Sequence, residues 1–162
     1  MPLSDFWTWL ESLTIATYIG ETWWFPFLES IHVIAATFVV GSILMVDLRL
    51  LGLAARNHPV SRITKETFLW TGGAFALSTL SGLGMFVGQA NRYMGNRAFQ
   101  VKLVLLVLAG INMAVFHLRT SRSIATWDAA AATTVAAKFG GAGSLLLWIS
   151  IMLAGRWIGH LS

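Results

Sequence analysis

Two histidines stand inside long apolar segments, where an ionisable side chain is costly and is therefore a functional candidate. His32 and His117 lie in different segments, near opposite ends of what would be two parallel helices. Imidazole can ligate haem iron or copper, and it can exchange protons and hydrogen bonds with a quinone. At about 1.5 Å per helical residue the two rings lie roughly 20 Å apart and cannot share one haem. Each would need a second ligand, from His160 for His32, from His58 for His117, or from another subunit.

Charged side chains accompany both histidines. At about 100° per residue, Glu29 and Asp47 share a helix face, and His32 lies close to it. We expect carboxylates to orient the imidazoles or carry protons, and cations to hold anionic cofactor groups. The predicted cofactor-binding residues are His32, His117, Glu29, Asp47, Lys102 and Arg156.

Charge pairing gives a structural alternative for the same residues. Glu29 lies at a depth where it could pair with Arg156 or Lys102. Asp47 could pair in the same way with Arg49 or Arg119. Such pairs would remove much of the burial penalty and fix helix register without any further function.

Methionines allow a second kind of site. Met85 and Met152 fall at a depth similar to that of His32, and Met113 precedes His117 by one helical turn. Thioether and imidazole ligands suit Cu(I). The metal-site alternative therefore comprises His32, His117, Met85, Met152 and Met113, and its function would be copper transport or binding.

These residues must be positioned by membrane helices. Hydrophobic residues make up 56% of the 162, charged residues only 11%, and a small soluble domain could not bury that much apolar surface. Four segments approach the roughly 20 residues that a bilayer core requires. The predicted spans are about 26–50, 68–90, 99–118 and 136–158, joined by linkers near 51–67 and 119–135 and a tight polar turn near 91–98. Gly82, Gly84 and Gly88, and the Gly140–Ser144 region, are expected to let helices pack closely.

Residues 1–21 predict a short amphipathic helix lying along the membrane interface. Phe6, Trp9, Leu10 and Leu13 recur at helical spacing. The segment has no Lys or Arg and so lacks the basic start of a signal peptide, and we expect it to be retained. The expected fold is an all-α four-helix transmembrane bundle over 22–162 with this interfacial helix in front of it.

Basic residues predict the orientation. The side of the first and third linkers, with the span ends that adjoin them, holds seven of the eleven Lys and Arg, and cytoplasmic loops retain such residues. Both termini are therefore expected in the periplasm of a bacterial inner membrane. The basic residues form no dense stripe, which argues against nucleic-acid binding. The absence of cysteine excludes thiolate chemistry, iron–sulfur clusters and thioether-linked haem on this chain, and no metalloprotease, phosphate-loop or nucleophile-elbow motif is present.

The segments WWFPFLESIHVIAATFVVGSILMVDLRLLGLA, FQVKLVLLVLAGINMAVFH and LLLWISIMLAGRWI resemble a family of small four-span bacterial membrane proteins of unknown function. The resemblance covers most of the chain and is carried by Glu29, His32, Asp47, Arg49, Leu51, Gly52, Lys102, His117, Gly155 and Arg156. It implies the four-helix fold and the inner membrane, but no activity.

Three functions are predicted. The first is a small redox membrane subunit that binds haem b or a quinone headgroup, and the second is the copper protein described above. The third is a non-catalytic accessory subunit. We expect lipid around the helices, and either a homo-oligomer or membership of a larger membrane complex. The sequence leaves it open whether the chain is an enzyme.

Overall fold

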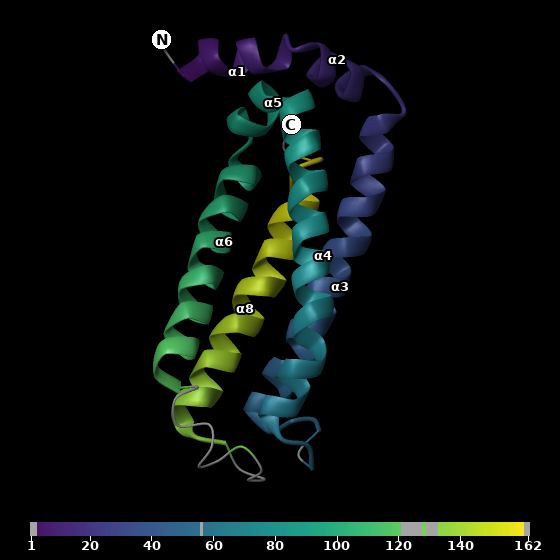
Figure 1. The fold of residues 1–162 in the computed structure, drawn as a ribbon. Helices are drawn as coiled ribbons and strands as arrows, with labels where there is room; N and C mark the ends of the chain where they lie inside the picture. Colours follow the sequence, from purple (N-terminus) through teal and green to yellow (C-terminus); the bar gives the residue numbers. More distant parts are fainter. Residues whose placement is uncertain (1–2, 56, 121–127, 129–132, 161–162) are drawn as a thin grey trace.

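The computed structural model is all-α over the residues it describes, which are 3–55, 57–120, 128 and 133–160. Four long helices stand side by side, and short helices lie across one end of them (Figure 1). The elements are α1 (Leu3–Glu11), α2 (Thr14–Glu21), α3 (Trp24–Leu51), α4 (Val60–Gly88), α5 (Ala90–Gly95), α6 (Arg97–Val115), a π-helical turn η1 (Phe116–Thr120) and α8 (Val135–Trp157).

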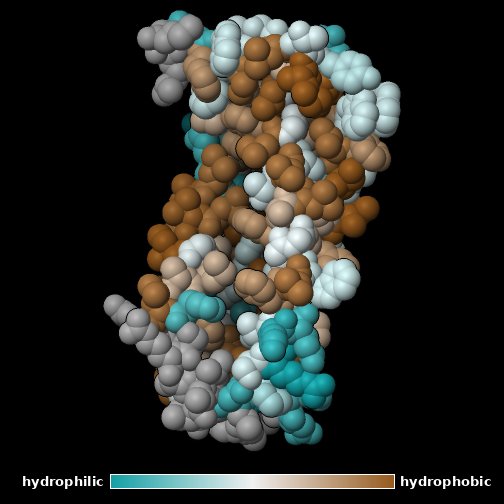
Figure 2. Space-filling model, viewed as in Figure 1, coloured by the Kyte–Doolittle hydropathy of each residue, from teal (hydrophilic) through white to brown (hydrophobic). Residues whose placement is uncertain are grey.

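The four long helices confirm the predicted membrane fold. Each is apolar and long enough to cross a bilayer, at 28 residues for α3, 29 for α4, 22 for Arg97–Leu118 and 23 for α8. Large hydrophobic side chains such as Leu69, Trp70 and Phe139 are exposed along them, as expected where lipid is the solvent. Figure 2 shows this apolar surface in the middle of the molecule and a hydrophilic surface toward the end opposite the short helices. The chain is thus a multi-pass membrane protein.

The long helices pack as an open series in the order α4, α3, α8 and α6. α3 packs along both α4 and α8, and α8 packs along α6, whereas α4 and α6 share no comparable interface among the described residues. Glycines bring these helices close. A side chain at Gly84 would meet Leu28, and one at Gly141 would meet Leu50 and the Asp47 carbonyl.

One end of the bundle, here called the capped end, carries α1, α2, α5 and both chain termini (Figure 1). The N-terminal segment forms two helices where one was predicted. Glu11 accepts hydrogen bonds from the Asn91 backbone N–H at 2.8 Å and side-chain amide at 2.7 Å. Gly20 touches the Gly88 backbone so closely that no side chain fits at either position without a shift. These contacts fasten α1 and α2 over the ends of α4 and α5.

Aromatic rings extend the same attachment. Trp7 meets Phe86 edge-on, with ring centroids 5.6 Å apart, and Phe86 stacks on Phe99 at 5.7 Å. The predicted polar turn near 91–98 is the short helix α5 followed by Asn96, whose side chain caps the first turn of α6. Phe86 and Phe99 thereby join α4 to α6 at the capped end.

The opposite end, called the loop end, is held by polar contacts to the backbone. α3 stops at Gly52, whose φ of 73° is favourable for glycine. α4 then begins at Val60, inside the predicted 51–67 linker, because Asp128 caps it: Val60 N–H donates to the Asp128 carbonyl, and the Ser61 N–H and hydroxyl donate to its carboxylate. Partial burial raises the pKa of Asp128, but these hydrogen bonds outweigh it and leave the pKa below its usual value.

Candidate functional site

His32 is held by α4 in a defined orientation. Its Nδ1 lies 2.7 Å from the Ser78 carbonyl oxygen. A carbonyl only accepts, so Nδ1 carries the proton and, in the neutral ring, Nε2 is left with a lone pair. The hydroxyls of Ser78 and Ser81 lie 3.4 and 3.5 Å from Nδ1. The ring is therefore fixed by one strong contact and flanked by two hydroxyl groups.

Gly82 makes room for this imidazole. A side-chain carbon at Gly82 would lie only 3.0 Å from Cε1 and 3.1 Å from Nδ1 of His32. The absence of a side chain therefore brings the ring against the α4 backbone, where it reaches the Ser78 carbonyl. The sequence pattern Ser78, Ser81, Gly82 is thus a seat for the ring as well as a helix-packing motif.

Lys102 reaches His32 from α6. Its Nζ lies 3.5 Å from Nε2 of His32, where an ammonium N–H can donate to the ring nitrogen. The side chain passes α8 at Gly155, where an added carbon would lie 3.7 Å from Nζ. The four long helices thus all contribute: α3 the imidazole, α4 its seat, α6 the cation and α8 the space for that cation.

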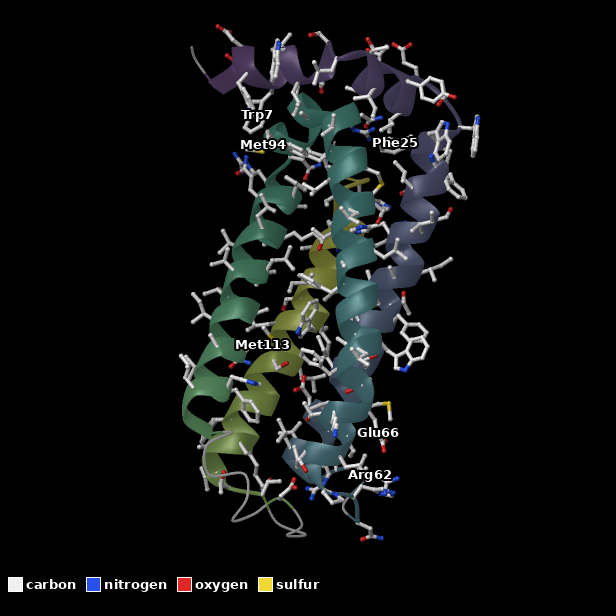
Figure 3. The ribbon with its side chains drawn as sticks, viewed as in Figure 1. Trp7, Phe25, Arg62, Glu66, Met94 and Met113 are labelled. Carbon is white, nitrogen blue, oxygen red and sulfur yellow. The ribbon has the colours of Figure 1, made fainter. Side chains whose placement is uncertain are left out.

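Lys102 has no carboxylate partner among the residues that the structure describes. The ion pair found there is Arg62 with Glu66, at 2.8 Å on the exposed surface of α4 near the loop end (Figure 3). The alternative pairing of Glu29 with Lys102 or Arg156 is not present in the described part of the chain. A cation inside a membrane bundle therefore faces a neutral nitrogen, an arrangement that suits an additional electron-rich group.

Four other predicted site residues differ in exposure; they are Glu29, Met85, Met152 and Arg156. Glu29 is exposed but close enough to act electrostatically on His32 and on Tyr93. Burial, and then the charge of Glu29, raise the pKa of the Tyr93 phenol. Met85 is buried in α4, whereas Met152 and Arg156 are exposed on α8.

Asp47 and Arg49, for which an ion pair was one of the predicted alternatives, have separate partners. Asp47 is buried, with the Ser144 hydroxyl of α8 as a hydrogen-bonding neighbour. Arg49 is fully buried and donates to the carbonyls of His58, at 2.8 Å, and Asp128, at 3.4 Å. It therefore joins α3 to two loop segments. No Asp47–Arg49 ion pair occurs, and the side chain of Arg119 lies outside the described residues.

The four histidines do not lie together in the structure. His117 is exposed in the π-helical turn, and Met113 is 68% exposed on α6 (Figure 3). The suggested second ligands, His58 and His160, are exposed at the loop end and the capped end respectively. In the described ranges no three His, Asp or Glu side chains come together as a metal-binding group.

A lipid-facing groove adjoins the His32 site. It encloses about 690 Å³ between α3 and α4 and is lined almost entirely by apolar side chains. Ala35, one turn from His32, and Leu77, next to Ser78, lie at its end nearest the site. The groove continues toward the loop end past Phe38 and Trp70.

The sequence analysis did not identify two residues that stabilise the loop end. Asp128 and Thr133 lie beside apolar or alanine-rich segments, yet Asp128 caps α4 and Thr133 donates to the Leu50 carbonyl at 2.5 Å. A lone Asp in a small-residue linker is a weak signal for a cap because the helix it caps is remote in sequence.

The family described as "Family of unknown function (DUF6644)" matches residues 6–161. No curated protein and no solved structure matches the chain.

Proposed function

We propose that this chain, which belongs to the DUF6644 family of unknown function, binds the headgroup of a membrane quinone beside the contacting pair His32 and Lys102. One observation carries the proposal: the Lys102 ammonium lies inside the bundle, 3.5 Å from a neutral ring nitrogen, with no carboxylate partner among the described residues. A buried cation is stable only when other groups solvate it. A quinone carbonyl oxygen supplies such a group without adding a net charge.

The pair suits both redox forms of a quinone. Lys102 can donate a hydrogen bond to the carbonyl of the oxidised form. When the Lys102 ammonium turns from Nε2 of His32 to the ligand, Nε2 can accept a hydrogen bond from the hydroxyl of the reduced form, because Nδ1 carries the ring proton. The serine hydroxyls beside the ring add adaptable donors. A site with one donor and one acceptor at neighbouring atoms can therefore hold the headgroup before and after reduction.

The surroundings favour a ligand that arrives from the lipid. α1 and α2 cover the capped end, and Phe86 on Phe99 closes the outer part of the α4–α6 side. Below that contact α4 and α6 share no extensive interface, and Figure 2 shows the surface hollowed between them. The apolar α3–α4 groove begins within a turn of His32 and can hold an isoprenoid chain. A lipophilic ligand fits these routes better than a water-soluble one.

Haem b is less well supported by the same geometry. Iron would take Nε2 of His32, the atom that Lys102 faces, and a second axial ligand would have to come from elsewhere. Copper would draw on Met85 and Met152 beside His32, but Met152 is exposed on α8. Both cofactors remain as outcomes of the experiment below.

In this proposal the chain is the quinone-binding subunit of a larger inner-membrane complex or homo-oligomer, with both termini in the periplasm. Glu29 tunes His32 electrostatically from the lipid-exposed side. Arg156 and His117 lie outside the headgroup site.

The test is direct. The protein is purified in mild detergent, its bound lipids are extracted and identified by mass spectrometry, and binding of a short-chain quinone is titrated. Lys102→Met should weaken binding by about 10- to 100-fold, the value of a hydrogen bond to a charged group. Lys65→Met, which removes an exposed lysine near the loop end, is the matched control and should leave affinity unchanged.

The same preparation separates the alternatives. An absorption spectrum with a Soret band would replace quinone by haem b, and copper in elemental analysis, lost in Met85→Leu, would replace it by a metal site. If wild-type protein neither carries nor binds quinone, or if Lys102→Met and Lys65→Met behave alike, the proposal is wrong.

A further inference from the structure

Asp47 is a carboxyl group enclosed within the membrane span of α3. It is only 4% exposed, and its Oδ2 is buried with no hydrogen-bond partner among the described residues. The neighbour of the carboxyl group on α8 is the hydroxyl of Ser144, which is neutral. Gly141 packs against the Asp47 backbone and Leu50 on the same side. The carboxyl group is thus surrounded by close helix packing and one hydroxyl.

The charged groups on the surrounding elements have other partners or are exposed. On α3, Arg49 donates to the carbonyls of His58 and Asp128. On α4, Arg62 is paired with Glu66 at the surface, and on α8 Lys138 is exposed. Asp128 is engaged with Ser61, and α6 contributes the neutral Asn112, which donates to the Gly140 carbonyl. No salt bridge to Asp47 occurs within the described ranges.

An ionised carboxylate in this position would be an uncompensated charge in a medium of low dielectric constant, which costs several kcal/mol. Binding a proton removes the charge and converts Oδ2 into a hydroxyl that can donate a hydrogen bond. We infer that Asp47 is a proton-binding site inside the membrane, in which the resting group is the neutral carboxylic acid and the proton exchanges with water at the loop end.

The position of Asp47 supports exchange at that end. Asp47 lies about four residues before the end of α3, roughly 6 Å along the helix, whereas His32 is roughly 22 Å away in the other direction. The site is therefore separate from the proposed quinone site, and the inference does not rest on that proposal.

The ligand is a proton and not a metal cation. Hard cations such as Ca²⁺ or Mg²⁺ take six or more oxygen ligands. The described surroundings of the Asp47 carboxyl group supply the carboxylate itself and the Ser144 hydroxyl, and no group of three His, Asp or Glu side chains forms there. A single exchangeable proton needs no such shell.

The experiment uses dicyclohexylcarbodiimide, an apolar reagent that enters membranes and reacts with protonated carboxyl groups. The acid oxygen adds to the central carbon of the reagent while its proton moves to a reagent nitrogen, so nothing leaves and the adduct is covalent. Intact protein in lipid nanodiscs is treated at neutral pH, and the labelled peptide is identified by mass spectrometry. The label should fall on Asp47, disappear in Asp47→Asn, and persist in Glu66→Gln, which removes an exposed carboxylate.

A second measurement needs no variant. Infrared spectra of the wild-type protein should show a protonated carboxyl C=O band at neutral pH that shifts in D₂O. Absence of both the label and the band would overturn the inference, as would a label that sodium ions suppress while potassium ions do not. If Arg119→Gln creates a label that the wild-type protein lacks, Asp47 is an ionised partner of Arg119 and the inference is equally refuted.

Discussion

Replacing Gly82 by alanine tests whether the imidazole of His32 truly rests against α4. The added methyl carbon would lie 3.0 Å from Cε1 and 3.1 Å from Nδ1, closer than unstrained carbon contacts allow. The ring cannot move away from α4 without losing the hydrogen bond that Nδ1 donates to the Ser78 carbonyl oxygen at 2.7 Å. We expect the ring to move by a few tenths of an ångström and its contact with Lys102 to change.

The expected change in the free energy of unfolding is the sum of two opposing effects. An extra methyl group in a packed interior costs about 1–3 kcal/mol, whereas alanine in place of glycine within a helix gains about 0.5–1 kcal/mol. Gly72→Ala, on the same helix, has no atom within 4 Å of the added carbon and should show the gain alone. The two variants should therefore differ in unfolding free energy by about 1–3 kcal/mol, with Gly82→Ala the less stable.

The assay is reversible unfolding in mixed micelles, together with ¹⁵N spectra of histidine-labelled protein. Gly82→Ala should shift the His32 ring nitrogens and weaken quinone binding, whereas Gly72→Ala, outside the lining of the α3–α4 groove, should leave both unchanged. Equal stabilisation by the two alanines, with identical His32 spectra, would show that the ring does not occupy this position and would refute the site geometry.

Three further predictions concern the two ends of the bundle. Gly20→Ala places a carbon 2.7 Å from a backbone oxygen of α4, and should release α2 and raise hydrogen exchange in α1 and α2. Arg49→Met should cost about 1.5–3 kcal/mol of unfolding free energy in thermal or denaturant scans, and Lys65→Met almost nothing. Because hydrogen bonds lower the pKa of Asp128, its stabilising effect should be present above the unfolded pKa, about 3.9, and vanish as the pH falls through the lower folded value. Asp128→Asn should therefore lower the melting temperature less at acid pH than at neutral pH.

The sequence predicted the helices well and the directions of their polar side chains less well. The apolar blocks set four helices. Of the residues predicted to bind a cofactor, His32 and Lys102 lie in contact. Helical counting put Glu29 and Asp47 on one face of α3, yet Glu29 is exposed and Asp47 is buried. Helical periodicity gives the relative directions of two side chains around the helix axis. It does not say which neighbouring helix, if any, packs against each side chain at its depth in the membrane.

Helix ends were hard to predict for a related reason. α4 begins at Val60 because Asp128 supplies a cap, and α6 is capped by Asn96 after the short helix α5. The Asn96 cap is local and was within reach of sequence reasoning. The Asp128 cap joins segments far apart in the chain, so polar composition made 51–67 resemble a loop.

The buried groups Arg49 and Asp47 and the half-buried Lys102 differ in how their charge is compensated, and this difference distinguishes structural from functional residues. Arg49 donates to two loop carbonyls and thereby ties the loop end together. Asp47 is best accommodated by losing its charge to a proton. Among the described residues, Lys102 has no backbone carbonyl partner of the kind that Arg49 has. Its ammonium faces the lone pair of His32 Nε2 and lies beside Gly155. Since an ammonium has three protons to donate, the half-buried Lys102 retains capacity for another acceptor, which is why the ligand is placed there and not at Arg49 or Asp47.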